Sequence, residues 1–220
     1  MSKLSTFREA SLGIAILACA ACATTKPVAY SGLASSSQLQ TNAADRSGRV
    51  PYAYHADVSW RAYDNAIVDP VVIYDGTDSQ FEKVEEGDKQ SLARYMEEEF
   101  RRSLSERFKL VDVPLPRTLR VKLSLTGAKL TPQLVGTVTK FDLMGGPYNL
   151  IQGIRGKEGA FAGSVSYAVE IYDAATNELL SAFVEKQFPN AMNVKASFGA
   201  LGASRAGVRK GAAELAERFN

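Results

Sequence analysis

Apolar and polar residues alternate with a period of two along the second half of the chain. In residues 119–130, apolar side chains occupy positions 119, 121, 123 and 125, and charged or hydroxyl side chains occupy positions 120, 122, 124 and 126. Residues 161–173 alternate similarly, and the polar sequence AATNE separates them from the apolar stretch 179–188. This alternation predicts strands with one buried face. The short turn indicates that the last two strands form a hairpin.

Two other stretches repeat their apolar residues with the period of a helix. Residues 85–108 begin with acidic side chains, which favour a helix N-terminus, and then repeat apolar residues four positions apart. Residues 196–219 place their apolar side chains on one stripe and predict a closing helix. Ala203, Gly207 and Gly211 are spaced four apart within it. These small residues indicate close approach of the helix to a sheet; the alternative is a self-association face.

The remaining apolar stretches complete the fold prediction. AIVDPVVIYD at 66–75 predicts a strand interrupted at Pro70, since proline donates no ladder hydrogen bond, and KLVDV at 109–113 predicts a short strand. We therefore expect an α+β fold, a two-layer domain with a mostly antiparallel sheet covered on one face by two main helices. The polar row in 119–130 predicts that the second face is partly exposed.

Residues 24–56 follow neither period and are dominated by Ser, Ala, Asn and Gly. We predict a flexible tether at 19–56 and a single domain at 57–220. A free coil of about 30 residues would reach on the order of 30 Å and hold the domain away from a membrane. Partial contact of the tether with the domain is expected through Tyr30, Leu33, Tyr52 and Tyr54.

The first residues have the layout of an export signal. Lys3 and Arg8 precede a short apolar run that ends in small residues, which is typical of a secretory signal peptide. The run is shorter than the roughly 20 apolar residues of a membrane span. We assign residues 1–18, or alternatively 1–21, to a cleaved signal.

Both cysteines of the chain follow this run, three positions apart. A C-x-x-C redox or metal motif requires a folded context, which an export signal does not provide. The sequence Ile16-Leu17-Ala18-Cys19 resembles a bacterial lipobox, and Cys22 offers an alternative lipidation site. The resemblance implies a membrane anchor of acyl chains such as palmitate. Because Ala rather than Asp follows either cysteine, it also implies sorting to the outer membrane, facing the periplasm.

Charge and motifs exclude several classes of function. The 26 Lys and Arg nearly balance the 24 Asp and Glu, so nothing indicates nucleic-acid binding. The only histidine, His55, lies in the expected tether, and Asp69 and Asp173 are expected to bond the local backbone. No phosphate-binding glycine motif follows a strand. We expect no cofactor, no metal and no enzymatic activity.

The segment 132–159 is long, apolar and interrupted by glycines. Loops of this length are often functional. One interpretation is a crossover that covers the sheet; the other is an exposed surface for an envelope protein partner. The proposed partner surface comprises Phe141, Leu143 and Ile154.

Several segments together resemble a known family. WRAYDNAIVDPVVIYD, TLRVKLSLTGAKL and GSVSYAVEIYDAATNELL occur in order and are similar to the bacterial lipoprotein family called domain of unknown function 3313. The resemblance covers residues 30–219, with Asn177 where relatives carry glycine. It implies an export anchor, a compact domain and no catalytic residues. We expect a non-catalytic binding or scaffolding lipoprotein; the alternative is a small-molecule or lipid-binding module with its cavity between sheet and insertion.

Overall fold

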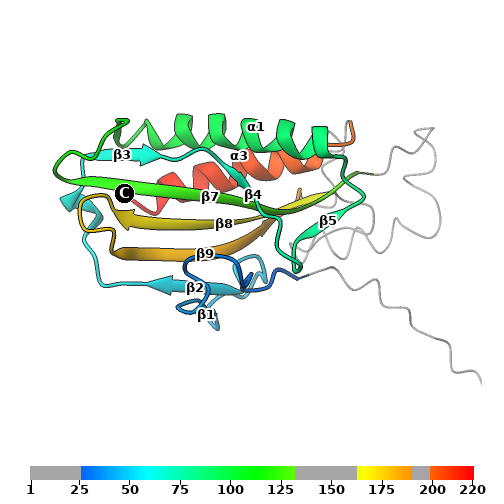
Figure 1. The fold of residues 1–220 in the computed structure, drawn as a ribbon, viewed down its shortest axis with the longest axis horizontal. Coiled ribbons are helices and arrows are strands. Elements are labelled where there is room, and N and C mark those ends of the chain that lie inside the picture. Colours follow the sequence, from blue (N-terminus) through cyan, green and yellow to red (C-terminus); the bar gives the residue numbers. More distant parts are fainter. Residues whose placement is uncertain (1–25, 132–162, 190–198) are drawn as a thin grey trace, which may run out of the picture.

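The computed structural model describes residues 26–131, 163–189 and 199–220, which form one open mixed sheet with two helices on one face (Figure 1). The strands follow the order β1-β2-β9-β8-β7-β3-β6, and β4 and β5 extend the β3 side along β7. The elements are β1 (Gln40–Thr41), β2 (Tyr52–His55), the 3-10 helix η1 (Trp60–Ala62), β3 (Asn65–Val68), β4 (Val72–Ile73), β5 (Gln80–Glu82), α1 (Glu86–Leu104), β6 (Lys109–Leu110), β7 (Thr118–Lys129), β8 (Ser164–Asp173), β9 (Leu179–Gln187) and α3 (Gly202–Glu217).

The central strands β7, β8 and β9 confirm the period-two prediction. They pair antiparallel, with Val121 opposite Ile171 and Ile171 opposite Ser181. The turn between β8 and β9 places Asn177 at φ 58, a left-handed conformation that asparagine tolerates. The predicted hairpin is therefore confirmed.

The other side of β7 is parallel. The strands β3, β4 and β5 run one after another along β7, and Pro70 lies between β3 and β4, where the break was predicted. In the sequence, α1 follows β5 and precedes β7. It returns the chain to the end of the sheet where β3 begins, so that β7 can run parallel to β3, β4 and β5. The α+β class is confirmed, and its sheet is mixed, with an antiparallel centre and a parallel edge.

The helices α1 and α3 cover one face of the sheet; in Figure 1, α3 passes behind β7 and α1 runs along the top of the view. The helical period of α1 is confirmed because its stripe is buried with no exposed surface: Leu92, Met96, Phe100 and Leu104. A Cβ added at Gly207 would lie 2.9 Å from Val165, and one at Gly211 would lie 1.7 Å from the Tyr167 hydroxyl. The small residues of α3 therefore allow close packing on β8, and the self-association interpretation is wrong.

The expected contacts of Tyr30, Leu33, Tyr52 and Tyr54 with the domain are confirmed, but residues 26–56 are packed too extensively to form a flexible tether, so that part of the prediction is wrong. β2 pairs with β9 along its whole length, and Tyr30 and Leu33 are buried at 1% and 6% exposure against Ala168 and Val184 on the second face of the sheet. Figure 1 shows this N-terminal segment crossing the front of β9 and β2. The segment is largely irregular, so it has no sequence period, yet it covers β9 from one side while β8 pairs on the other, and all nine residues of β9 are buried. The domain thus begins before residue 57.

We call the end of the sheet at which β5 and Lys26 lie the Lys26 end (Figure 1, right). Gln80 donates to the Lys26 carbonyl at 2.9 Å, and Thr131 donates its N–H to Ala200 at 3.0 Å. On the neighbouring strands, Lys129 pairs with Ser164 and Val165 with Gln187. The opposite end, with the β8–β9 turn, is called the hairpin end.

Candidate functional site

A pocket of about 330 Å³ lies at the hairpin end, between β9 and the C-terminal turn of α3. Three parts of the chain form it: the β2–η1 region, the β8–β9 hairpin and the end of α3. Its lining residues are His55, Trp60, Ile171, Ser181, Phe183, Leu215, Arg218 and Phe219.

Aromatic rings form the walls of this pocket. The Trp60 and Phe219 rings meet edge to face with centroids 5.1 Å apart, and Phe108 packs on the other side of Phe219 at 5.0 Å. Phe219 follows the end of α3 and is 2% exposed, so burial of this ring holds the C-terminal turn in place. The apolar wall is thus held by contacts within the domain core.

The polar groups of the pocket come from facing strands and the helix end. His55 and Ser181 are cross-strand partners, with His55 Nδ1 and Ser181 Oγ 2.9 Å apart. Burial, and secondarily the Arg218 charge, lower the pKa of His55, which keeps the imidazole neutral at pH 7. The Arg218 guanidinium lies 4.1 Å from the centroid of the Phe183 ring. These groups present hydrogen-bond donors beside an apolar cavity.

A buried polar cluster continues from the pocket between α3 and β9. Glu185 is 2% exposed and accepts from Gln187 Nε2 at 2.6 Å, and Gln187 also donates to Glu214. Burial raises the pKa of Glu185 to about 7; Arg218 opposes the rise, and Glu214 adds to it. The hydroxyl of fully buried Tyr167 has its pKa raised well above 10 by burial and by Glu185. The Arg218 charge therefore acts both on His55 in the pocket and on Glu185 in this cluster.

A second buried carboxylate fastens the N-terminal segment to the opposite face. Glu170 Oε1 accepts from the Ser35 N–H at 2.7 Å and from the Tyr172 hydroxyl at 3.3 Å. The Lys122 ammonium lies 4.7 Å from the Tyr172 ring centroid. This arrangement satisfies a charge that is 5% exposed, and its role is structural.

The structure places only some of the residues selected from the sequence. Cys19, Cys22, Phe141, Leu143 and Ile154 lie outside the described residues. 

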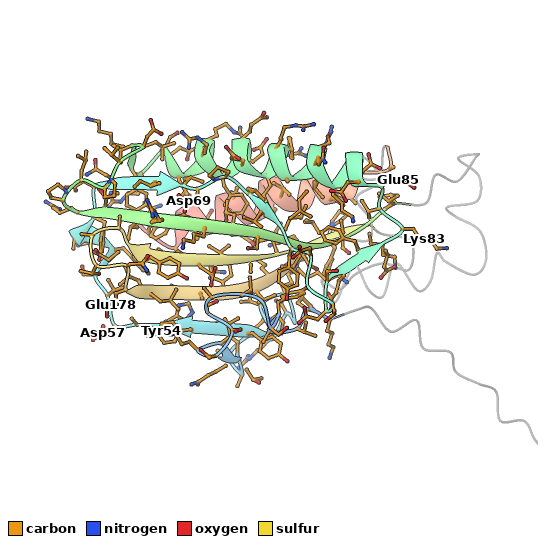
Figure 2. All side chains as sticks on the ribbon, in the orientation of Figure 1. Tyr54, Asp57, Asp69, Lys83, Glu85 and Glu178 are labelled. Atoms are coloured by element: carbon orange, nitrogen blue, oxygen red, sulfur yellow. The ribbon has the colours of Figure 1, made fainter. Side chains whose placement is uncertain are left out.

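The other selected residues can be compared directly. His55 belongs to β2 rather than to a tether, so that prediction is wrong. Asp173 accepts from the N–H groups of Ala175 and Thr176 at 2.9 Å, as predicted. Asp69, labelled in Figure 2, instead lies 3.7 Å from Arg120 in an ion pair.

Sequence reasoning missed Trp60, Ser181 and Arg218. No local motif marks them, because they come from three elements that only the fold brings together. Within the described ranges, no three His, Cys, Asp or Glu side chains are grouped to hold a metal ion. None of the helices described is long and apolar enough to cross a membrane.

The family model "Protein of unknown function (DUF3313)" matches residues 29–215. The chain belongs to this family. The resemblance seen in the sequence is therefore confirmed, and the DUF3313 match begins inside the N-terminal segment that packs on the sheet. It ends before Arg218 and Phe219, so two pocket residues lie beyond the matched range.

The chain is also similar to solved structures with low sequence identity. The hypothetical protein CT253 from Chlamydia trachomatis has 12% identity and a TM-score of 0.40, with coverage of 71% of this chain and 98% of that one. The PelC dodecamer from Paraburkholderia phytofirmans has 8% identity and a TM-score of 0.35, covering 69% and 88%. Protein XCC0632 from Xanthomonas campestris, a DUF330 protein, has 7% identity and a TM-score of 0.36, covering 69% and 81%. No curated protein matches the chain.

Proposed function

We propose that this chain is a lipid-anchored outer-membrane lipoprotein facing the periplasm, whose DUF3313 domain is a non-catalytic binding or scaffolding domain held close to the membrane. The position of Lys26 carries this proposal. Residues 26–56 are packed on the domain, so only the residues between the anchoring cysteine and Lys26 remain as a link.

The length of that link limits the distance to the membrane. From Cys19 to Lys26 is seven residues (26 − 19), which span at most about 25 Å when fully extended. From Cys22 it is four residues (26 − 22), at most about 14 Å. The Lys26 end of the sheet would therefore face the lipid surface.

The same end supports the proposed partner surface of Phe141, Leu143 and Ile154. Their segment leaves the described fold at Thr131 and returns at Gly163, beside the Lys129–Ser164 strand pair. The segment is thus attached at the end that the anchor would hold near the membrane. A partner that binds it would be an envelope protein at the inner leaflet of the outer membrane.

The non-catalytic assignment is supported by the burial of Ser181. This side chain lies beside the only histidine and is 2% exposed. Attack on a substrate carbonyl would require the strand to move, because a nucleophile must approach its target to about 3 Å.

Partner capture from solubilised membranes tests the proposed surface. Asp substitutions at Phe141, Leu143 and Ile154 are expected to abolish copurification of an envelope protein without changing the melting temperature. Asp substitutions at Val113 and Leu115 are the matched controls, because both are exposed apolar residues, 60% and 40% exposed, near the hairpin end. Equal recovery of partners with both sets would contradict the proposed surface.

A further inference from the structure

We propose that the pocket at the hairpin end binds a small carboxylate with an apolar body of about ten non-hydrogen atoms. This site is distinct from the proposed partner surface. Val165, at the Lys26 end of β8, and Ile171, in the pocket, are six residues apart, roughly 20 Å along a strand. The inference therefore does not depend on the lipid anchor.

The size and walls of the pocket fit such an occupant. A volume of about 330 Å³ is near the lower limit of small-molecule sites, which are concave and mainly apolar. Five of the eight lining residues are aromatic or aliphatic: Trp60, Ile171, Phe183, Leu215 and Phe219. They would contact the apolar body of the ligand.

The polar part of the lining selects for an acceptor. The Arg218 guanidinium has hydrogen-bond donors, Ser181 is 2% exposed and bonded to His55, and no carboxylate is among the eight lining residues. Figure 2 labels Asp57 and Glu178 at this end of the molecule, but neither lines the pocket. A cationic ligand would therefore be repelled by Arg218 with no carboxylate of the lining to offset the repulsion. An anionic ligand would instead accept a charge-assisted hydrogen bond from Arg218.

Arg218 is placed to make that bond. Its aliphatic stem leaves the last turn of α3, and its guanidinium stacks on Phe183, which orients the planar group at the pocket wall. Besides the Phe183 ring, the described groups that this guanidinium interacts with are Glu185, Tyr167 and His55, through its charge. The neighbouring carboxyl, Glu185, has a pKa near 7 and so neutralises Arg218 only in part at neutral pH.

The register of β2 directs the His55 side chain toward the same cavity. Tyr54, labelled in Figure 2, packs with Tyr172, Leu179 and Ala182 on the face of the N-terminal segment. Because successive side chains of a strand point to opposite faces, His55 lies on the α3 face. Its Nδ1 is engaged with Ser181, and Nε2 carries the proton and can donate it in the tautomer in which Nδ1 accepts from the Ser181 hydroxyl.

Tryptophan fluorescence tests the site directly, because Trp60 is the only tryptophan of the chain and lines the pocket. The full chain is titrated with sodium octanoate and with 1-octanol, in phospholipid nanodiscs if it is acylated and free in buffer otherwise. Octanoate should change the Trp60 emission saturably, and octanol should bind about 10-fold more weakly or worse, because it lacks the charge-assisted bond.

Two substitutions on α3 separate recognition from folding. Arg218→Gln should weaken octanoate binding by about 10-fold and abolish the preference over octanol. Arg209→Gln is the control, because Arg209 bonds the Tyr95 hydroxyl of α1 at 2.8 Å, outside the pocket lining; its binding should equal that of the unmodified chain. Equal affinity for octanoate and octanol, unchanged binding in Arg218→Gln, or no saturable emission change would each overturn the proposal.

Discussion

The Ser35 N–H donates a buried 2.7 Å hydrogen bond to Glu170, a residue 135 positions later in the chain. This contact joins the irregular N-terminal segment to the middle of β8, on the face that the helices leave open. It therefore fixes the start of the domain near residue 26 and shortens the link to the proposed membrane anchor.

Glu170→Ala should destabilise the domain. The substitution removes the acceptor of two hydrogen bonds and leaves the Ser35 N–H buried without its partner, which costs about 2 kcal/mol. Glu178→Ala, in the exposed β8–β9 turn, should change the free energy of unfolding by less than about 0.5 kcal/mol. Denaturant unfolding of both variants measures the difference, and equal midpoints would show that the Ser35 contact contributes nothing.

Shortening the chain tests the corrected domain boundary. A chain that starts at Lys26 retains the residues that cover the second face and should unfold cooperatively. A chain that starts at Asp57 lacks β1, β2, Tyr30 and Leu33, so it exposes Ala168 and Val184. It should aggregate or unfold without cooperativity. Circular dichroism during heating distinguishes the two. Identical cooperative melting would restore the interpretation of 26–56 as a tether.

Gly211→Ala should be destabilising although alanine is the better helix former. Its Cβ would meet the buried Tyr167 hydroxyl, and overpacking of this kind costs about 1–3 kcal/mol. Tyr167→Phe should relieve part of the cost by removing that oxygen. Gly87→Ala in α1 is the control: no atom lies within 4 Å of its added Cβ, so the helix should gain about 0.5–1 kcal/mol. Equal effects at the two glycines would contradict the close packing of α3.

Glu185 should make the domain less stable as pH rises. Its folded pKa of about 7 lies above the ordinary value of 4.5, so the folded state holds a proton that the unfolded state releases. The penalty is absent well below pH 4.5, grows as the pH rises toward 7, and is constant at higher pH. The polar groups around Glu185 in this cluster are Tyr167, Gln187, Glu214, Lys210, Arg218 and Arg49, which donates to Gln187 at 2.8 Å.

Comparing the free energy of unfolding of the unmodified chain with that of Glu185→Gln separates the pH effect of Glu185 from the opposite pH effect of His55. The lowered pKa of His55 makes the folded state lose stability as pH falls through 6.5 and below. Denaturant unfolding at pH 5, 6, 7 and 8 should show the glutamine variant gaining on the unmodified chain as pH rises. A difference that stays constant over this range would contradict the elevated pKa of Glu185.

The elements with a regular period could be predicted from the sequence, and the irregular ones could not. Leu92 and Met96 on α1, and the alternation along β7, indicate buried faces because the spacing matches one element. The parallel edge depends on how α1 returns the chain to β7, which no local pattern records.

The full packing of the N-terminal segment and the pocket could not be predicted, for a related reason. Contact through Tyr30 and Leu33 is expected from the sequence, but these residues bury their side chains without repeating structure, so a composition rich in Ser and Ala still indicates a tether. In the pocket, Trp60 and Arg218 are 158 positions apart (218 − 60), and they line the same cavity only because the fold brings the end of α3, where Phe219 packs on Trp60, next to η1. The glycines of α3 were interpreted correctly because close approach requires small residues at fixed spacing.

The intact mass of the protein recovered from membranes tests the lipid anchor most directly. It is measured for the unmodified chain and for Cys19→Ser and Cys22→Ser separately. We predict a mass that begins at one of the two cysteines and includes acyl chains, lost with that substitution alone. An unmodified mass in the soluble fraction would contradict the anchor and the membrane-proximal position of the Lys26 end.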